Sequence, residues 1–227
     1  MTTHLVSLSA GAIRRARLSD ARLYLVTDAR TRQGDLEAFL DRILEAGVDI
    51  VQLREKHAEA GDLIRWGRIF KRAADRFGAL FLVNDRPDVA IAVEADGVHL
   101  GQNDLPVGVA RRMLGEDMLI GLSTHAEREF WQVPVDADYM CAGPVFETPT
   151  KPGRPASGHS LVRFAAEQMR IETTPRPWFA IGGIDATTLP EVVAAGAARV
   201  VVVRAIAEAG DPAAAVRELL AKLPPIS

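Results

Sequence analysis

Three side chains at the end of one apolar run could bind a phosphorylated substrate. Gln52, Arg54 and Lys56 alternate with Leu53 and Glu55 in this segment. In an extended strand, alternate side chains point to the same face, so the amide and the two cations would share a face. An arginine grips phosphate through two parallel hydrogen bonds, and a lysine supplies a mobile positive charge. The pattern favours a phosphate-binding site, with a solvated charged loop as the alternative.

Two carboxylates follow two further apolar runs. Asn84 and Asp85 end one of these runs, and Asp104 comes shortly after the next. Mg²⁺ usually takes one or two carboxylates from a protein, while substrate phosphate and water supply its other ligands. Helix capping is the alternative role, because a proline follows each aspartate two residues later. The recurrence at two neighbouring strand ends favours a magnesium site formed by Asp85 and Asp104.

The remaining apolar runs end in hydroxyl, glycine and cationic residues. Residues 143–154 are the longest loop and have the composition of a segment that covers a ligand. The paired glycines at 182–183 let the backbone approach an anion closely, with a tight turn as the alternative. The candidates from these runs are Ser123, His125, Thr148, Pro149, Thr150, Lys151, Gly183, Val203 and Arg204.

Two other reactive side chains fit structural roles better. Cys141 lies inside an apolar run with no neighbouring base, so we expect it in the core. His99 also lies inside an apolar run, where a histidine hydrogen-bonded within the fold is the more common finding than a catalyst. Neither side chain is taken as a site residue.

The elements that must position these candidates alternate regularly along the chain. Short apolar runs are followed by longer amphipathic stretches, the pattern of a parallel sheet with crossover helices. About eight such units predict an α/β fold, a single (β/α)8 TIM barrel, rather than an open sheet of fewer strands. In this fold functional side chains lie after the carboxyl ends of the strands, where the candidates fall. The predicted strands are residues 23–27, 50–54, 80–83, 97–100, 118–122, 139–142, 178–181 and 200–203, and the predicted helices are 36–46, 62–77, 87–92, 107–114, 125–131, 160–168, 188–195 and 212–220.

Composition bounds the partners and the compartment. The chain has 227 residues, and 27 Lys plus Arg against 30 Asp plus Glu give a net charge of −3. That balance offers no general attraction to nucleic acid or to anionic lipid. A single cysteine excludes an internal disulfide framework and suits a reducing compartment, so a cytoplasmic location is expected. The sequence contains no run of about 18 apolar residues, so it predicts no membrane span.

The chain divides into a short leader and one domain. Residues 1–21 are rich in arginine, poor in acids and lack an apolar segment, so we interpret them as a partly disordered N-terminal extension, with a transit peptide as the alternative. No linker interrupts residues 22–227, which form the expected catalytic barrel. Dinucleotide, P-loop and multi-cysteine zinc motifs are absent from the sequence, which argues against dehydrogenase, NTPase and zinc functions.

The motifs taken together resemble the thiamine-phosphate synthase family. The resemblance covers about residues 22 to 216, and the ordered series of motifs is far more specific than the glycine motif alone. The segments that carry it are QLREK (52–56), ND (84–85), GVHLGQNDLP (97–106), GLSTH (121–125), GPVFETPTKPG (143–153), AIGGI (180–184) and VVVRAI (201–206).

The resemblance implies a condensation and assigns roles to the candidates. Members of the family join 4-amino-5-hydroxymethyl-2-methylpyrimidine diphosphate to a thiazole or carboxythiazole phosphate, giving thiamine phosphate and diphosphate. The family's reaction is dissociative, so it needs charge neutralisation and alignment rather than a protein nucleophile. The resemblance implies that the catalytic residues are Arg54, Lys56, Ser123 and Lys151. It also implies that Asp85 and Asp104 bind Mg²⁺. Substrate would be held by Gln52, Leu53, Arg54, Glu55, Lys56, Asn84, Ser123, Thr148, Pro149, Thr150, Lys151, Gly183, Val203 and Arg204.

Two alternatives to a synthase stay open at this point. A related thiazole tautomerase would use His125 as its acid and base, although it would not need the diphosphate and magnesium residues. A non-catalytic barrel that binds a phosphorylated metabolite would need only the phosphate loops. Arg204 departs from the family pattern, which usually has serine there. The expected partners are small-molecule substrates, without nucleic acid or membrane, and a homodimer is left open.

Overall fold

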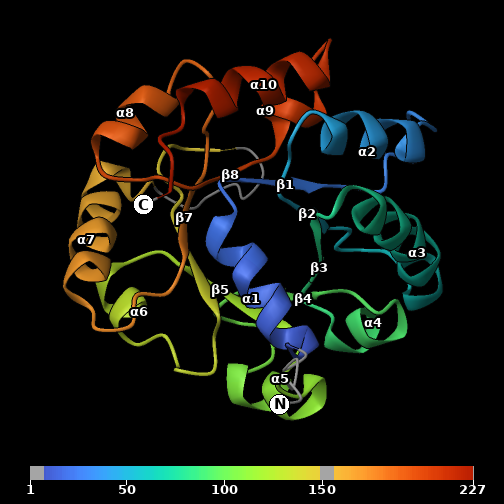
Figure 1. Cartoon of the computed structure of the whole chain (residues 1–227), viewed down its shortest axis with the longest axis horizontal. Helices are drawn as coiled ribbons and strands as arrows, with labels where there is room; N and C mark the ends of the chain where they lie inside the picture. The colour runs from blue at the N-terminus through green and yellow to red at the C-terminus, as the bar shows by residue number, and fades with distance from the viewer. Residues whose placement is uncertain (1–7, 149–155, 227) are drawn as a thin grey trace, which may run out of the picture.

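A closed barrel of parallel strands organises the molecule. The computed structural model describes residues 8–148 and 156–226. Each strand pairs with the next along the chain, and β1 pairs with β8 to close the barrel, while the helices surround it (Figure 1). The predicted (β/α)8 TIM barrel is confirmed. The strands are β1 (Leu23–Thr27), β2 (Ile50–Leu53), β3 (Leu80–Asn84), β4 (Gly97–Leu100), β5 (Leu119–Thr124), β6 (Tyr139–Ala142), β7 (Trp178–Ile181) and β8 (Val200–Val202).

The helices bury one apolar stripe each against the outside of the barrel. In α3 the buried residues include Leu63, Phe70 and Ala74, spaced so that they share one face. Phe70 stacks on Phe81 of β3 with 5.4 Å between the ring centroids. The helices are α1 (Ala10–Asp20), α2 (Leu36–Glu45), α3 (Ala60–Phe77), α4 (Pro87–Ala92), α5 (Val107–Leu114), α6 (Glu127–Trp131), α7 (Gly158–Ile171), α8 (Leu189–Ala194), α9 (Arg204–Ala207) and α10 (Pro212–Lys222).

Alternate strand residues form two separate cores. One set packs between the barrel and its helices, and Leu53 and Val83 belong to it. The other set fills the barrel interior, where Tyr24, Tyr139 and Phe179 are completely buried. Because these strands are buried on both faces, their sequences do not show which residues face the barrel interior. The alternation of side chains along each strand and the closure of the barrel separate the two cores.

The N-terminal segment differs from its prediction. The interpretation of residues 1–21 as a partly disordered extension is wrong for residues 10–20, which form α1. This helix lies across the amino-terminal opening of the barrel, facing the viewer in Figure 1. Its Leu18, followed by Ala21, packs into the interior core. The sequence concealed this role because few apolar side chains are needed to cover the end of a barrel.

Charged residues at the barrel bottom fasten α1. Arg14 Nε donates to Asp96 Oδ1 at 2.9 Å, and Arg15 Nε donates to Asp138 Oδ1 at 2.7 Å. The second oxygen of each aspartate accepts a backbone N–H, from Phe81 and Ile120 respectively. Asp96 immediately precedes β4 and Asp138 immediately precedes β6. The same two carboxylates therefore hold both the strands and α1.

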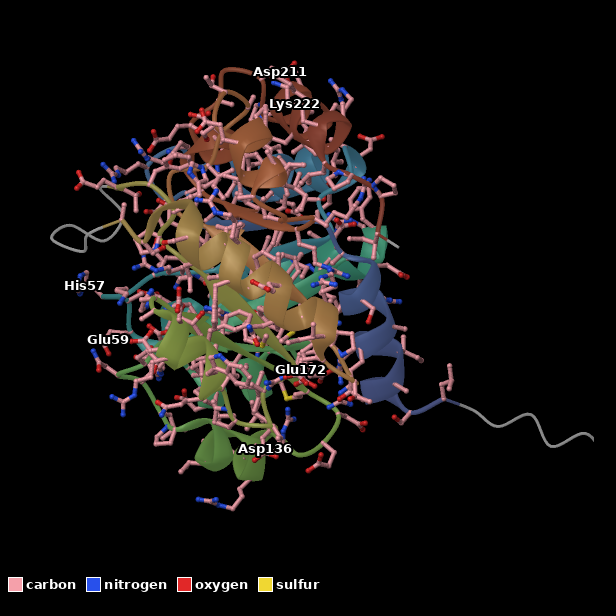
Figure 2. The ribbon with its side chains drawn as sticks, turned by 90° about the vertical axis from the view of Figure 1, so that its left-hand side faces the viewer. His57, Glu59, Asp136, Glu172, Asp211 and Lys222 are labelled. Carbon is pink, nitrogen blue, oxygen red and sulfur yellow. The ribbon has the colours of Figure 1, made fainter. Side chains whose placement is uncertain are left out.

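The candidate site lies at the other end of the barrel. His57 and Glu59, which follow β2, appear in Figure 2 on the side of the molecule opposite α1. The carboxyl ends of all the parallel strands open on that side. Among the described residues, no helix is both long enough and apolar enough to cross a membrane.

Candidate active site

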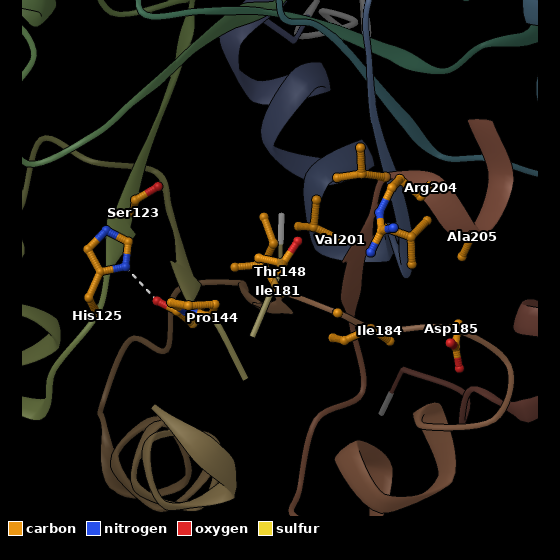
Figure 3. A pocket seen from close by; sticks show the side chains of 15 residues that line it. Ser123, His125, Pro144, Thr148, Ile181, Ile184, Asp185, Val201, Arg204 and Ala205 are labelled. Atoms are coloured by element: carbon orange, nitrogen blue, oxygen red, sulfur yellow. Dashed lines mark hydrogen bonds between the residues drawn. The ribbon is translucent and has the colours of Figure 1, made fainter. Parts of the chain in front are cut away.

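Two adjoining cavities open at the carboxyl ends of the strands. The smaller, about 80 Å³ in volume, is lined by residues that include Gln52, Arg54 and Asp85, and we call it the carboxylate cavity. The larger, about 320 Å³ in volume, is lined by residues that include Gly183 and Arg204, and we call it the glycine cavity (Figure 3). Ser123, Ile181, Val201 and Val203 line both cavities, so the two lie side by side.

The segment after β2 divides between the pocket and the scaffold. Gln52, Arg54 and Lys56 line the carboxylate cavity, as the alternation predicts. The Leu53 side chain instead packs between the barrel and its helices. Glu55 Oε1 accepts the backbone N–H of Ala29 at 3.1 Å and so joins two loops. The expectation that Leu53 and Glu55 bind substrate is therefore not supported for their side chains, neither of which lines the cavity.

The two aspartates lie together in the carboxylate cavity. Burial, a hydrogen bond with Asp104 and repulsion by its charge raise the pKa of Asp85 to about 6, against a smaller opposing effect of Lys56. Lys56 Nζ lies 4.0 Å from Asp85 Oδ2. Asp104 Oδ2 accepts the backbone N–H of Gly101 at 2.7 Å. Like charges held this close favour binding of a cation between them.

Neither aspartate acts as a helix cap. The N-cap residues of α4 and α5 are Arg86 and Pro106, and no side chain caps either helix. Asp85 has a φ of 61°, a left-handed conformation that is uncommon for residues other than glycine but that aspartate adopts more readily than most. A non-glycine residue held in this conformation at a cavity is often functional. The capping alternative is therefore excluded for both residues.

The donor set fits magnesium better than a metal that needs many protein ligands. In the described part of the chain, no group of three or more His, Cys, Asp or Glu could hold a metal ion. Two carboxylates with Asn84 beside them leave several positions of an octahedron to substrate oxygens and water. The arrangement suits an ion that bridges protein and a phosphorylated substrate.

Ser123 and His125 occupy different parts of the pocket. Ser123 Oγ lies 2.9 Å from His99 Nε2, which confirms His99 as a hydrogen-bonded barrel residue. His125 faces the glycine cavity, with its Nδ1 bonded to the carbonyl oxygen of Gly143 (Figure 3). Its backbone N–H donates to Glu129 Oε2 at 2.7 Å. Cys141 is 1% exposed, in agreement with the expected core position.

Backbone geometry at residues 182–183 shapes one wall of the glycine cavity. Gly182 and Gly183 have φ of 110° and 67°, conformations that disfavour other residues. A Cβ on Gly183 would lie 2.7 Å from the Cβ of Phe146. The turn therefore requires glycine twice, and its backbone lines the cavity beside Val203.

Arg204 begins α9 with its side chain at the glycine cavity. Arg204 lines the glycine cavity (Figure 3) and also a neighbouring cavity that Arg54 and Glu208 line. The Glu208 N–H donates to the Arg204 carbonyl oxygen at 3.0 Å. No ion pair joins these two side chains in the part of the chain that the structure describes. The alternative of an outward Arg204 paired with Glu208 is thus not adopted.

The covering loop is described only at its beginning. Thr148 lines the glycine cavity, as predicted. The predicted site residues Pro149, Thr150 and Lys151 lie outside the described residues.

Three contributors were missed among the candidates. Gln102 Nε2 donates to the carbonyl oxygen of Ser123 at 2.7 Å and so fixes the backbone at the junction of the two cavities. Its position just after a predicted strand was the available signal. Tyr24 and Tyr139 were also missed, because tyrosines within apolar strands resemble ordinary core residues.

Comparison with known proteins identifies the family. A family model described as thiamine monophosphate synthase matches residues 23–206. The chain belongs to the thiamine monophosphate synthase family. Thiamine-phosphate synthase of Acidothermus cellulolyticus is 56% identical over 211 residues, which cover 92% of this chain and 98% of that protein. The Streptomyces avermitilis thiamine-phosphate synthase is 57% identical, with 92% and 96% covered.

A solved structure agrees with this assignment. Thiamine phosphate pyrophosphorylase from Pyrococcus furiosus superposes with a TM-score of 0.78 at 32% identity, covering 90% of this chain and 95% of that one. As a member of the thiamine monophosphate synthase family, the chain is a transferase, as the motifs indicated. The tautomerase and non-catalytic alternatives are not favoured.

Proposed function

We propose that this pocket condenses 4-amino-5-hydroxymethyl-2-methylpyrimidine diphosphate with a thiazole phosphate, giving thiamine phosphate and diphosphate. The observation that carries the proposal is the meeting of two chemically different cavities at Ser123. One cavity has cations and paired carboxylates, which suit a diphosphate and its metal ion. The other has a glycine turn and an arginine, which suit a single phosphate. Two anionic substrates bound in this way would place their reactive ends side by side.

The side chains divide according to the cavity they line. We assign the diphosphate to Arg54, Lys56, Asn84 and Lys151, and the pyrimidine ring to Gln52 and Ser123. Thiazole phosphate falls to Thr148, Thr150, Gly183, Val203 and Arg204. The bond between the pyrimidine methylene carbon and the diphosphate oxygen breaks with its electron pair on oxygen. The thiazole nitrogen then donates its pair to that carbon. Cations beside the departing oxygens stabilise the negative charge that develops on them and so lower the activation free energy.

Asp85 and Asp104 would hold Mg²⁺ in the carboxylate cavity. The raised pKa of Asp85 supports this role, because it reflects burial together with a second carboxylate beside it. Bound there, Mg²⁺ would neutralise negative charge on the diphosphate. Lys56 lies beside the same carboxylate and would also contact the diphosphate.

Diphosphate release by the purified protein tests the proposal. We expect release only with both substrates and Mg²⁺ present, and none with either substrate alone or with excess EDTA. Isomerisation of a carboxythiazole phosphate without any pyrimidine substrate would instead support a tautomerase. Binding of either substrate without release would support the non-catalytic alternative.

Two variants separate the enzymatic alternatives further. Lys151→Ala should reduce kcat more than it raises the KM for thiazole phosphate, because we place Lys151 on the departing diphosphate. His125→Ala should have a mild effect on condensation, whereas a tautomerase would lose nearly all activity. The opposite order of severity would contradict a synthase.

We further propose that the enzyme works in the cytoplasm on small molecules alone. A net charge of −3 and a single cysteine support this assignment. A homodimer remains compatible with it.

A further inference from the structure

A chain of buried hydrogen bonds crosses the barrel interior from β2 to β5. Gln52 Nε2 donates to the Tyr24 hydroxyl, which lies 3.2 Å from the Tyr139 hydroxyl. That hydroxyl lies 3.0 Å from His99 Nδ1, and His99 Nε2 lies 2.9 Å from Ser123 Oγ. All five side chains are at most 7% exposed. Both ends of the chain, Gln52 and Ser123, line the carboxylate cavity.

The amide end of the chain determines its polarity. An amide nitrogen donates only, so the Tyr24 oxygen accepts from Gln52. The Tyr24 hydrogen then goes to Tyr139, its other partner, because a buried hydroxyl without an acceptor is costly. Tyr139 in turn donates to His99 Nδ1. With Nδ1 as an acceptor, a neutral His99 carries its hydrogen on Nε2 and donates it to Ser123.

The hydroxyls keep the hydrogens that this order requires. Burial is the largest cause that raises the pKa of Tyr24 and of Tyr139 well above the usual value for tyrosine. Both phenols therefore stay protonated over the working pH range. Each phenol therefore donates one hydrogen bond to the next side chain.

Packing holds the rings of the chain in one arrangement. Phe179 makes edge contacts with Tyr24 and Tyr139, with ring centroids 5.7 and 5.8 Å apart. A Cβ on Gly121 would lie 2.0 Å from the Cζ of Tyr139, so the ring occupies the space of the missing side chain. This packing therefore keeps the hydroxyl oxygens of Tyr24 and Tyr139 at their positions in the chain.

We propose that this chain positions the Ser123 hydroxyl as a hydrogen-bond donor to a ring nitrogen of the pyrimidine substrate. Ser123 Oγ accepts from His99, so its own hydrogen is left for a ligand at the border of the two cavities, which Ser123 lines on both sides. A ring nitrogen can accept this hydrogen, whereas a C–H group in its place cannot. His99, Tyr139 and Tyr24 are thus positioning residues that select an aromatic ring with nitrogen at that point. The assignment of the ligand rests on the proposed condensation.

The tautomer of His99 tests the polarity without any substrate. In protein labelled with ¹⁵N at histidine, the nitrogen shifts of the ring distinguish an Nε2–H from an Nδ1–H tautomer. The His99 signals are identified by their loss in His99→Gln or, should that variant not fold, by elimination with asparagine variants of the other four histidines. We expect Nε2–H. An Nδ1–H tautomer overturns the proposal, whether or not the protein catalyses condensation.

Kinetics test the link from His99 to the substrate. Ser123→Ala and His99→Asn should each raise the KM for the pyrimidine diphosphate about five- to tenfold, as expected for one lost neutral hydrogen bond. The double variant should be no worse than either single variant, because both remove the same interaction. His99→Gln, whose amide can reach the position of Nε2, should recover part of the loss. Additive effects, or no recovery by glutamine, contradict the proposal.

Two controls separate positioning from general damage. Thr124→Val removes a neighbouring buried hydroxyl, which donates to the Cys141 carbonyl oxygen at 3.1 Å outside the chain. It should leave the KM for the pyrimidine diphosphate unchanged. A pyridine analogue that lacks the recognised nitrogen should bind wild type more weakly than the pyrimidine substrate does. Ser123→Ala should bind the analogue and the pyrimidine substrate equally well. Each of the two pyridine analogues, which lack one or the other ring nitrogen, is tested in this way. If neither analogue loses more affinity with wild type than with Ser123→Ala, the proposal is overturned.

Discussion

At the scale of single residues, the pair Asp85 and Asp104 carries an unfavourable interaction that the proposed Mg²⁺ site would explain. The folded protein holds two carboxylates together in a partly buried cavity, with Lys56 4.0 Å from one of them. A structural role would be served better by a carboxylate and an amide, which attract rather than repel. The repulsion is useful only when a cation occupies the cavity.

Asp85→Asn should therefore stabilise the metal-free protein while it lowers activity. Turnover at saturating Mg²⁺ should fall at least about a hundredfold, because a lost metal ligand removes several kcal/mol of leaving-group stabilisation. In EDTA the variant should unfold at a higher temperature than wild type. Condensation assays and thermal unfolding measure the two effects. Loss of activity without a gain in metal-free stability would contradict the like-charge explanation.

Burial of Asp85 beside Asp104 also predicts a pH dependence of stability. The pKa of Asp85 is about 6 in the folded protein, against about 3.9 for an unfolded aspartate. The folded state binds the extra proton between these values, so this group's contribution to stability falls as pH rises from about 4 to about 6. Urea unfolding in EDTA between about pH 4 and 7 should show wild type losing stability relative to Asp85→Asn. A constant difference over that range would show that Asp85 has an ordinary pKa.

Arg204 gives a second prediction at this scale. It lines the glycine cavity and is not paired with Glu208. Arg204→Ser should raise the KM for thiazole phosphate roughly ten- to a hundredfold, since a hydrogen bond to a charged group contributes about 1.5–3 kcal/mol. The KM for the pyrimidine diphosphate should barely change. Arg217→Ser, at an exposed position on α10, serves as the control. A change within twofold at low salt would show that the guanidinium does not contact phosphate.

At the scale of elements, α1 separates stability from catalysis. It closes the amino-terminal end of the barrel, far from the carboxyl ends that form the pocket (Figures 1 and 2). In a TIM barrel, residues at this end contribute to stability and those at the other end to function. The arginine contacts of α1 therefore belong to the stability of the barrel.

Arg14→Ala should lower the free energy of unfolding without altering either KM. The Arg14 side chain is 20% exposed and that of Asp96 is 8% exposed, so the lost pair is mostly buried. We expect a loss of about 1–3 kcal/mol in urea unfolding. Arg17→Ala, at an exposed position on the same helix, should have little effect. A changed KM for either substrate would contradict the separation of the two ends.

The β2 segment shows how one element serves two purposes. Gln52, Arg54 and Lys56 line the pocket, while Leu53 enters the outer core. A shift of one residue in the register of β2 against β3 would exchange these faces and bury the cations in the core. The register therefore protects both the core and the site.

At the scale of the whole molecule, closure of the barrel brings distant residues to one pocket. Arg54 and Val203, which line the carboxylate cavity together, are separated by most of the chain. They meet because β8 pairs with β1. Ligands that bind this pocket consequently stabilise the entire fold.

Diphosphate with Mg²⁺ should raise the midpoint of thermal unfolding. At 100 times the dissociation constant, a ligand contributes about 2.7 kcal/mol, which corresponds to about 5–10 °C for a domain of this size. EDTA should abolish the shift if the carboxylate pair binds diphosphate through the metal. Differential scanning fluorimetry with Mg²⁺, diphosphate, both and neither gives the answer. An equal shift in EDTA would show that the cations alone hold the diphosphate.

The sequence by itself determined the order of strands and helices and the end of the barrel that holds the site. Both follow from local periodicity. A strand repeats every two residues and a helix every 3.6, and parallel strands present their carboxyl ends on one side. Polar residues such as Gln52, Asp85 and Ser123 could therefore be assigned to one mouth before any distance was known.

Only the tertiary structure decided which side chains meet. The repulsion between Asp85 and Asp104, the docking of α1 through Arg14 and the bonding of Tyr24 to Tyr139 all join residues far apart in sequence. Distances across a barrel depend on its closure and register, which no local pattern encodes. For the same reason a buried tyrosine in an apolar strand looked like ordinary core until its hydroxyl was found beside another.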